Sequence, residues 1–437
     1  MRRTLTGVFW LVLYLLIVLG PLALVLQAPA PPPRPFWVEL SIALGFVAFL
    51  QMGLQFVLVA RFHKVTDPYG IDIIMQYHRR IALVGAVMLL LHPLILVVRS
   101  PRMLALLNPF GGTTASRWGV ISVLALLVLI ATSIVRKPLR LSYEWWRWIH
   151  IITSVVAVAA ALVHILLVGV YTNSALKKGF FIVFAIAMIA VLLHLRIARP
   201  VLLRRRPWRV VEVQRERGRS WTLRAEPVGH AGMSFAPGQF VWMKPNSPFT
   251  FDEHPFSFSS SAESTDRVEF GIKELGDFTN RIGELAPGTP LFFDGPHGSF
   301  SIDIVPSAGY VFIAGGIGIT PIYSMIRTMA DRQDRRPVLL IYGSRTLENA
   351  PFRDELEALR TRVDLRIEYV LEHPEGDWPD ERGFIRREVL KRLLPEEKIK
   401  RDIFVCGPLP MMEIVESALV DLGIPEARIH TERFDLV

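Results

Sequence analysis

The sequence predicts a multi-domain protein: a six-helix transmembrane bundle, then an antiparallel β-barrel, then a parallel α/β domain. Three observations predict this architecture. Six long apolar stretches lie within residues 1–206. That segment holds 21 Lys+Arg against 4 Asp+Glu, whereas the remaining 231 residues hold 28 against 36. Beyond it, short β-rich runs are followed by strands that alternate with helical stretches. We therefore place the domains at residues 1–206, 207–305 and 306–437.

The apolar stretches come close to, or exceed, the roughly 20 residues that a helix needs to cross a bilayer. They lie near residues 8–26, 37–60, 73–98, 118–135, 146–170 and 179–199. The first stretch follows Met1-Arg2-Arg3 and could be read as a secretory signal peptide. Its apolar run is too long for that, so we predict an uncleaved first span.

The charges of the connecting loops predict the orientation of the spans. Most of the basic residues fall on the side of the N-terminus, including Arg61, Arg79, Arg80 and Arg136. The opposite loops carry fewer: Arg34, Arg99, Arg102, Arg117, Lys177 and Lys178. Because Lys and Arg gather in cytoplasmic loops, we expect a multi-pass protein of the cell membrane with both termini in the cytoplasm. The residues after the sixth span would then form a cytosolic module.

Composition excludes several classes of protein. A hydrophobic fraction of 51% with 20% charged residues is not that of a disordered chain. The net charge of +9 combines +17 in the apolar half with −8 in the rest of the chain, which argues against nucleic acid as a partner and for the lipid bilayer. The single cysteine, Cys406, excludes an intrachain disulfide and a cysteine-based zinc or iron–sulfur site.

Four histidines repeat one spacing inside the predicted membrane domain. His78 and His92 lie on the third span, and His150 and His164 lie on the fifth; each pair is 14 residues apart. Fourteen helical residues place two side chains within about 40° of one face and about 21 Å apart along the axis. The two spans run in the same direction, so His78 pairs in depth with His150, and His92 with His164.

Imidazoles in a membrane are costly and usually functional. Two facing imidazoles are suitable axial ligands of a haem iron, so we predict two b-type haems, with Arg79 and Arg80 as candidate partners of propionates. The alternative is a set of hydrogen-bonded core histidines or a proton relay. Trp145, Trp146 and Trp148 are interpreted as an interfacial belt rather than part of the electron path.

Motifs typical of a flavin and nucleotide module follow residue 206. His254-Pro255-Phe256-Ser257-Phe258-Ser259-Ser260 comes after a Pro237-Gly238-Gln239-Phe240 lead-in. Together with the membrane histidines, this motif resembles the transmembrane NADPH oxidase and ferric reductase family, over about residues 40–437. The resemblance implies that Phe256 packs on the isoalloxazine of FAD, that Ser257 reaches its N5 edge, and that His254 lies toward the pyrophosphate.

The same resemblance implies a second contact to the FAD pyrophosphate at a Gly-led turn into a short helix, where backbone N–H groups would be free. The FAD residues that we predict are His254, Pro255, Phe256, Ser257, Lys273, Gly276, Phe278, Thr279 and Phe434. For Lys273, a solvated lysine is the alternative. Phe434 resembles the terminal aromatic residue that shields the flavin in this family, although three residues follow it here.

A glycine-rich loop follows the apolar run Tyr310–Ala314 and opens a helix, which allows a pyrophosphate to approach the backbone closely. Arg345 follows the next strand and could bind a 2′-phosphate, which favours NADPH, with NADH as the alternative. The predicted NADPH residues are Gly315, Gly316, Gly318, Thr320, Pro321, Ser344, Arg345, Cys406, Gly407, Pro408 and Met411. No basic neighbour activates Cys406, so we interpret it as a packing residue rather than a nucleophile.

These features predict a transmembrane oxidoreductase that passes electrons from cytosolic NADPH through FAD and two haems to a small-molecule acceptor outside. The first interpretation of that acceptor is dioxygen, reduced to superoxide. The alternatives are a ferric chelate or a periplasmic or membrane partner protein. No residue is assigned as catalytic beyond those that hold the cofactors.

Overall fold

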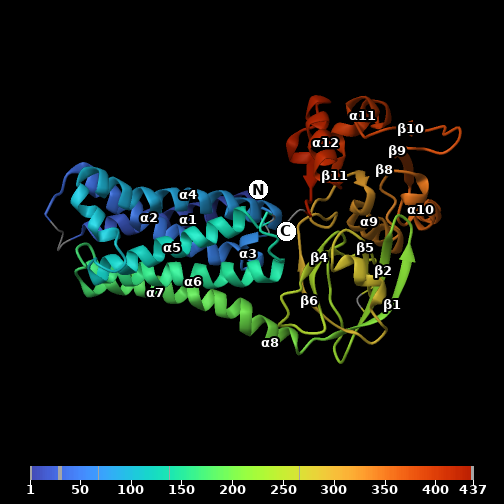
Figure 1. Ribbon diagram of the computed structural model, residues 1–437. Coiled ribbons are helices and arrows are strands. Elements are labelled where there is room, and N and C mark those ends of the chain that lie inside the picture. Colours follow the sequence, from blue (N-terminus) through green and yellow to red (C-terminus); the bar gives the residue numbers. More distant parts are fainter. Residues whose placement is uncertain (1, 28–31, 67, 137, 265, 435–437) are drawn as a thin grey trace. The chain divides into compact units, whose positions relative to one another are not determined.

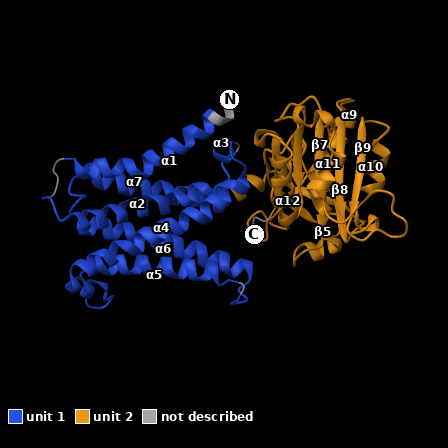
Figure 2. Ribbon diagram, turned by 90° about the horizontal axis from the view of Figure 1, so that it is seen from above, with its two compact units in different colours: residues 1–198 blue, residues 199–437 orange. Residues whose placement is uncertain are grey.

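The computed structural model describes residues 2–27, 32–66, 68–136, 138–264 and 266–434. The chain divides into two compact units, Met1–Ala198 and Arg199–Val437, which Figure 2 shows in different colours. The division falls eight residues before the boundary predicted at residue 206. The first unit is helical, and the second contains both β-sheets (Figure 1).

Within the described residues of the first unit, six helices are long and apolar enough to cross a membrane. They are α1 (Arg2–Leu26), α2 (Phe36–Leu58), α4 (Ile71–Arg99), α5 (Thr114–Ile134), α6 (Tyr143–Val168) and α7 (Ala175–Leu193). The sixth continues through a π-turn (His194–Ala198) into α8 (Arg199–Leu203). Two short elements connect the spans: α3 (His63–Thr66) and the 3₁₀ helix η1 (Pro101–Leu107).

Local sequence signals set several of the helix ends. The hydroxyls of Thr113, Ser142 and Ser174 accept hydrogen bonds from the first-turn N–H groups of α5, α6 and α7, which are otherwise unpaired. Gly169 ends α6 in the left-handed conformation, with φ of 67°. Because helices α4 and α6 are separated by one intervening span, they run in the same direction.

The helices pack most closely in two pairs, α2 with α4 and α5 with α6. Buried polar side chains bridge each pair: the Gln51 amide donates to the carbonyl of Ile81, and the Ser122 hydroxyl donates to the carbonyl of Ala157 at 2.9 Å. Such bonds hold neighbouring helices together where no water competes.

The first sheet of the second unit is antiparallel, with the order β4-β3-β6-β1-β2-β5. Its strands are β1 (Trp208–Glu216), β2 (Ser220–Pro227), β3 (Phe240–Pro245), β4 (His254–Ser257), β5 (Val268–Lys273) and β6 (Pro290–His297). An isolated antiparallel bridge between Phe258 and Phe270 joins the two edges of this order. The sheet is therefore curled around an apolar core, as the sequence predicts.

The second sheet is parallel, with the order β10-β9-β8-β7-β11-β12. Its strands are β7 (Tyr310–Gly315), β8 (Val338–Ser344), β9 (Leu365–Leu371), β10 (Glu381–Arg382), β11 (Asp402–Cys406) and β12 (Ile429–Thr431). Apolar cores lie on both faces. Helices α9 (Ile319–Asp331) and α10 (Arg353–Leu359) cover one face, and α11 (Arg387–Leu393) and α12 (Leu409–Asp421) cover the other. The predicted fold class is thereby confirmed.

Candidate functional site

The four membrane histidines form two facing pairs between α4 and α6. The ring centroids of His78 and His150 are 6.5 Å apart, and those of His92 and His164 are 6.4 Å apart. The rings within each pair are inclined by 57° and 69°. The structure thus brings together the same pairs that the 14-residue spacing predicts.

This spacing fits one metal ion between the two rings of each pair. A metal–imidazole bond is about 2.0 Å and a ring nitrogen lies about 1.1 Å from its centroid, so two rings on opposite sides of one ion have centroids about 6.2 Å apart. Among the described residues, no group of three or more His, Cys, Asp or Glu could hold a metal by itself. A macrocycle that supplies the other ligands, as haem does, fits a two-histidine site.

Hydrogen bonds fix the orientation of the His92–His164 pair. Nδ1 of His92 lies 2.8 Å from the backbone oxygen of Ser41 on α2, and Nδ1 of His164 lies 2.8 Å from that of Ala115 on α5. A carbonyl only accepts, so each Nδ1 carries the proton and each Nε2 keeps its lone pair for a metal. Two glycines make room for these rings. A Cβ on Gly45 or Gly119 would come within 3.3 Å or 3.0 Å of Nδ1 of His92 or His164, respectively.

The His78–His150 pair is held differently. Nδ1 of His150 lies 3.3 Å from the Ser133 hydroxyl of α5. Nδ1 of His78 is buried without a hydrogen-bond partner among the described residues. The Trp146 ring packs on His150 with a centroid distance of 5.2 Å. Sequence reasoning placed Trp146 in an interfacial belt, whereas the structure places it against a candidate iron ligand.

The predicted FAD residues gather around β4 in the antiparallel barrel. Three aromatic rings stack there: His254 on Phe278 at 4.4 Å, and Phe256 on Phe278 at 5.9 Å. Nε2 of His254 is hydrogen-bonded to the Asp252 carboxylate at 2.8 Å. The Ser257 hydroxyl is buried and has no partner within the described part of the chain. An aromatic surface beside an unsatisfied hydroxyl suits a flavin ring with polar edges.

The loop predicted to bind the FAD pyrophosphate is shaped by Thr279. Its hydroxyl accepts hydrogen bonds from the N–H groups of Leu275 and Gly276, both at 2.9 Å. These two groups are therefore not free, and the helix that follows is a 3₁₀ helix, η3 (Thr279–Glu284). Nζ of Lys273 lies 3.9 Å from where a Cβ of Gly316 would stand. The predicted FAD lysine thus lies beside the glycine-rich nucleotide loop.

The two predicted NADPH motifs interlock at the carboxyl ends of β7 and β11. A Cβ on Gly318 would lie 2.4 Å from the backbone oxygen of Cys406, and one on Gly407 would lie 3.0 Å from the backbone nitrogen of Gly315. Similarly, a Cβ on Gly315 would lie 2.6 Å from Sδ of Met411 and 2.8 Å from Pro408. Glycine is thus required here for backbone packing between the motifs.

Neighbouring residues complete the edge of the parallel sheet. The Thr320 hydroxyl donates to the carbonyl of Ile317 at 2.9 Å, and Thr320 and Pro321 are buried at the start of α9. Ser344 is buried at the end of β8. Arg345 follows it, is exposed, and makes no ion pair within the described residues. Its guanidinium is therefore available to an external anion.

Cys406 ends β11 completely buried. Burial, reinforced by the nearby Glu432 carboxylate, raises the pKa of this thiol well above its usual range. The thiol therefore stays protonated near neutral pH, as expected of a packing residue. Sequence reasoning missed Glu432, which is 7% exposed and whose side chain also approaches Gly298. Its only sequence signal was its position two residues before Phe434.

Phe434 packs against the core of the parallel domain and meets the Phe240 ring edge-on at 6.2 Å. Phe240 is paired with Ser257 in the β3–β4 register. The structure thus brings Phe434 to the strand pair that carries the predicted flavin residues. Its stacking on a flavin remains a prediction.

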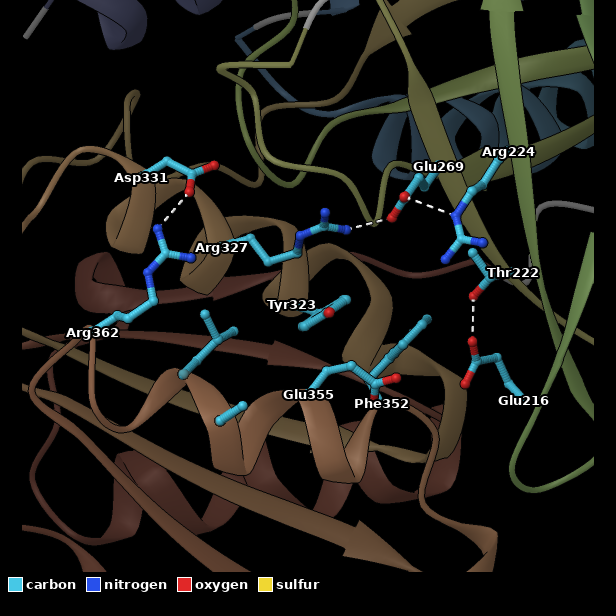
Figure 3. Close-up of a pocket in the computed structure, with 12 residues that line it drawn as sticks. Glu216, Thr222, Arg224, Glu269, Tyr323, Arg327, Asp331, Phe352, Glu355 and Arg362 are labelled. Carbon is cyan, nitrogen blue, oxygen red and sulfur yellow. Dashed lines mark hydrogen bonds and ion pairs between the residues drawn. The ribbon is translucent and has the colours of Figure 1, made fainter. Parts of the chain in front are cut away.

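A separate pocket of about 350 Å³ lies between strands β1, β2 and β5 and helices α9 and α10 (Figure 3). None of the predicted cofactor residues lines it. Burial alone would raise the pKa of Glu269, but the guanidiniums of Arg327 and Arg224 outweigh this effect and lower it. Stacked rings of Tyr323 and Phe352, 4.5 Å apart, form an apolar wall. The Arg327–Glu269 ion pair joins α9 to the barrel and is consistent with a structural role for this pocket.

Comparisons with known proteins match three segments of the chain. Residues 44–161 match the family model of the ferric reductase like transmembrane component. Residues 225–299 match an FAD-binding domain, and residues 312–417 match the oxidoreductase NAD-binding domain. The fold and these segments define a multi-pass membrane protein that carries an FAD- and NAD(P)-binding module.

Individual relatives match just under half of the chain or less. The chain is 30% identical over 209 residues to ferredoxin–NADP reductase B of Sorangium cellulosum, which covers 46% of this chain and 86% of the relative. It is 30% identical over 207 residues to the glycine betaine monooxygenase reductase subunit of Chromohalobacter salexigens, covering 46% of this chain. The chain spans 56% of that relative's length, and 57% of the NADH-cytochrome b5 reductase 2 of Scheffersomyces stipitis. The chain therefore belongs to the transmembrane NADPH oxidase and ferric reductase family, with a ferredoxin-reductase-type FAD/NAD(P) module.

Similar solved structures include the FAD/NAD-binding domain of nitric oxide dioxygenase from Vibrio cholerae, with 22% identity and a TM-score of 0.47 over 52% of this chain and 97% of that one. The flavohemoglobin of Malassezia yamatoensis has 18% identity and a TM-score of 0.49, and the match covers 94% of this chain and 97% of that one.

Proposed function

We propose that this protein passes electrons from cytosolic NADPH, through FAD and two b-type haems, to an acceptor on the outer face of the membrane. The observation that carries the proposal is the pair of facing histidine sets at 6.5 and 6.4 Å. When bound, FAD supplies the conversion from two-electron to one-electron transfer, and the haems supply the one-electron steps. The chain supplies binding, orientation and exclusion of water.

Within this proposal, Nε2 of His78 and His150 would hold the inner haem iron, and Nε2 of His92 and His164 the outer one. The carbonyls of Ser41 and Ala115 keep the outer ligands in the tautomer that binds iron. Arg79 and Arg80 are exposed beside the inner pair and remain candidates for the propionates. The bilayer excludes water from both pairs.

The ligand assignment is tested by counting haem in purified protein with the pyridine haemochrome assay. The wild type should hold two haems per chain. His92→Ala and His164→Ala should each reduce this to one. His194→Ala, in the sixth span and in ring contact with Phe62 rather than with another histidine, is the matched control and should retain two. Unchanged haem content in both ligand variants would refute the assignment.

The stacked rings of His254, Phe256 and Phe278 support binding of FAD at β4. The glycine loop at the end of β7 would receive the pyrophosphate of NADPH, where side chains would block the approach. Lys273 lies beside that loop, so its ammonium could neutralise a phosphate of either cofactor. The protonated Cys406 thiol and the Phe434 ring would line the region where nicotinamide meets flavin.

We attribute the preference for NADPH to the exposed guanidinium of Arg345. A charge-assisted bond to a 2′-phosphate contributes about 1.5–3 kcal/mol. Arg345→Leu should therefore raise the KM for NADPH roughly tenfold or more and leave the KM for NADH unchanged, as measured by steady-state kinetics. Arg335→Leu, which removes another exposed arginine after α9, is the control. Equal effects on both nucleotides would contradict the assignment.

Dioxygen, giving superoxide, is the first candidate acceptor. A ferric chelate is the second, and one observation favours it. Arg99, Arg102 and Lys178, on the proposed outer side, are exposed and have no carboxylate partner within the described residues, so they would attract an anionic chelate. The test compares cytochrome c reduction, with and without superoxide dismutase, with reduction of ferric citrate. Dismutase-insensitive signal with rapid iron reduction would select the chelate.

A partner protein as acceptor gives a distinct result. The haems would then be reduced quickly by NADPH, and turnover would stay negligible until the partner was added. Neither dioxygen nor ferric citrate would support steady consumption of NADPH in the purified protein.

A further inference from the structure

A polar and aromatic cluster surrounds one face of His150, at the ends of α5 and α6 that adjoin the loop between them. We call it the Ser133 cluster; it consists of Ser133, Arg136, Tyr143 and Trp146. The cluster contacts the His78–His150 pair through His150, with which it makes a hydrogen bond and a ring contact.

The hydrogen bonds of the Ser133 hydroxyl determine the tautomer of His150. A hydroxyl has one proton to donate and two lone pairs that accept. Here the proton goes to the carbonyl of Leu129, at 2.7 Å. Ser133 Oγ must therefore accept from its two other neighbours, Nε1 of Trp146 and Nδ1 of His150, both at 3.3 Å. Since Nδ1 carries the proton, Nε2 of His150 faces the shared site as a lone-pair donor.

Aromatic packing holds the same ring in place. The Trp146 ring lies 5.2 Å from the ring of His150 and 5.6 Å from that of Tyr143. The Arg136 guanidinium covers both aromatic rings, at 5.0 Å from Tyr143 and 5.4 Å from Trp146. Arg136, Tyr143 and Trp146 are partly exposed, and cation–π contacts at exposed sites contribute about 0.5–1 kcal/mol. Trp146 is thus held by Ser133, Tyr143 and Arg136. Its ring in turn limits the rotation of the His150 imidazole.

The two histidine pairs differ in the hydrogen bonds that their Nδ1 atoms make. Both rings of the His92–His164 pair are anchored to backbone carbonyls at 2.8 Å. In the other pair, Nδ1 of His78 has no partner in the described part of the chain. Within the described residues, the bond from His150 to Ser133 is therefore the one hydrogen bond that orients an Nδ1 of this pair.

We propose that Ser133 and Trp146 are positioning residues for the inner haem: they orient His150 and set its basicity as an iron ligand. This inference rests on the proposed function. An Nδ1–H···O bond increases electron donation by the imidazole and so favours the ferric state. Loss of the bond should raise the midpoint potential of the inner haem and leave that of the outer haem unchanged.

The test is a potentiometric titration of the full-length protein in detergent, followed in the haem absorption bands, together with haem content. Ser133→Ala should increase the ratio of reduced to oxidised inner haem at a fixed ambient potential roughly threefold, which corresponds to about 30 mV for a one-electron couple. Trp146→Phe keeps a ring against His150 but removes a donor to Ser133, so it should weaken haem retention less than Trp146→Ala. The matched control is Thr132→Ala, because within the described residues the Thr132 hydroxyl donates to the carbonyls of Val128 and Leu129 and not to a histidine.

Ser133→Thr retains the hydroxyl and should restore the wild-type potential, which separates positioning from general packing. Equal midpoint potentials in wild type, Ser133→Ala and Thr132→Ala, with two haems retained, would overturn the inference while leaving the proposed function intact. A shift of the outer rather than the inner haem would also overturn it. Absence of haem from the wild type would instead refute the proposed function.

Discussion

Gly119 on α5 provides a direct test of how closely the outer histidine pair is packed. A Cβ at this position would stand 3.0 Å from Nδ1 and 3.1 Å from Cε1 of His164. Non-bonded heavy atoms prefer separations of about 3.5–4.0 Å. Gly119→Ala therefore requires the imidazole of His164 to move by about 0.5 Å.

Such a movement weakens the hydrogen bond that orients His164. The bond from Nδ1 to the carbonyl of Ala115 is 2.8 Å, and a displacement of about 0.5 Å lengthens it to about 3.3 Å, where a hydrogen bond is weaker. Complete loss of an outer-shell partner of a metal ligand usually costs about 10- to 100-fold in affinity, which equals about 1.4–2.7 kcal/mol. We expect haem retention at the His92–His164 site to weaken by about 10-fold, the lower end of this range.

Haem content after purification and after prolonged washing in detergent measures the effect. Gly119→Ala should lose haem selectively and approach one haem per chain. The matched control is Gly179→Ala on α7, where a Cβ would meet no atom within 4 Å. Two tightly held haems in Gly119→Ala, or equal loss in the control, would refute this reasoning about the outer pair.

Three further predictions concern the second unit. Gly318→Ala places a Cβ 2.4 Å from the backbone oxygen of Cys406, so flavin reduction by NADPH should fall at least tenfold while reduction by dithionite is retained; unchanged NADPH kinetics would contradict this. The carboxylate of Glu253 lies 3.0 Å from Nζ of Lys244, whose side chain is 7% exposed. Glu253→Ala removes that carboxylate from a buried ammonium and should lower the free energy of unfolding by about 3–5 kcal/mol in a denaturant titration. A loss below about 1 kcal/mol would refute this prediction. Arg327 lowers the pKa of Glu269 below its ordinary value of 4.5, so this pair stabilises the fold above about pH 4.5 and the contribution is lost as the pH falls through the folded pKa. Glu269→Gln should therefore reduce the unfolding temperature at pH 7 more than at pH 4, and an equal reduction at both would argue against the pair.

The order of domains, the six spans and the pairing of the histidines were predictable from the sequence. Each of these features depends on residues close together in the chain. An apolar run long enough to cross a bilayer is a local property. The 14-residue spacing places both histidines on one helix face whatever surrounds the helix. Likewise, a glycine-rich loop between a strand and a helix indicates a nucleotide site by its local context.

The partners of those residues were not predictable, because they come from distant parts of the chain. Ser41 meets His92 across 51 residues, and Ala115 meets His164 across 49. A backbone carbonyl leaves no mark in the sequence, and a glycine that makes room for an imidazole looks like any other small residue of a membrane helix. The binding of Leu275 and Gly276 by Thr279 was also hidden, although all three lie within five residues, because loop geometry decides it.

Patterns within single segments thus specify the type of each element and the depth of each membrane histidine, since periodicity and length act within one segment. The packing of distant segments sets the orientation of each imidazole, brings Trp146 into contact with His150, and places Glu432 beside Cys406. Those outcomes depend on the packing of separate helices and strands against one another, where displacements of a few tenths of an ångström decide whether a hydrogen bond forms.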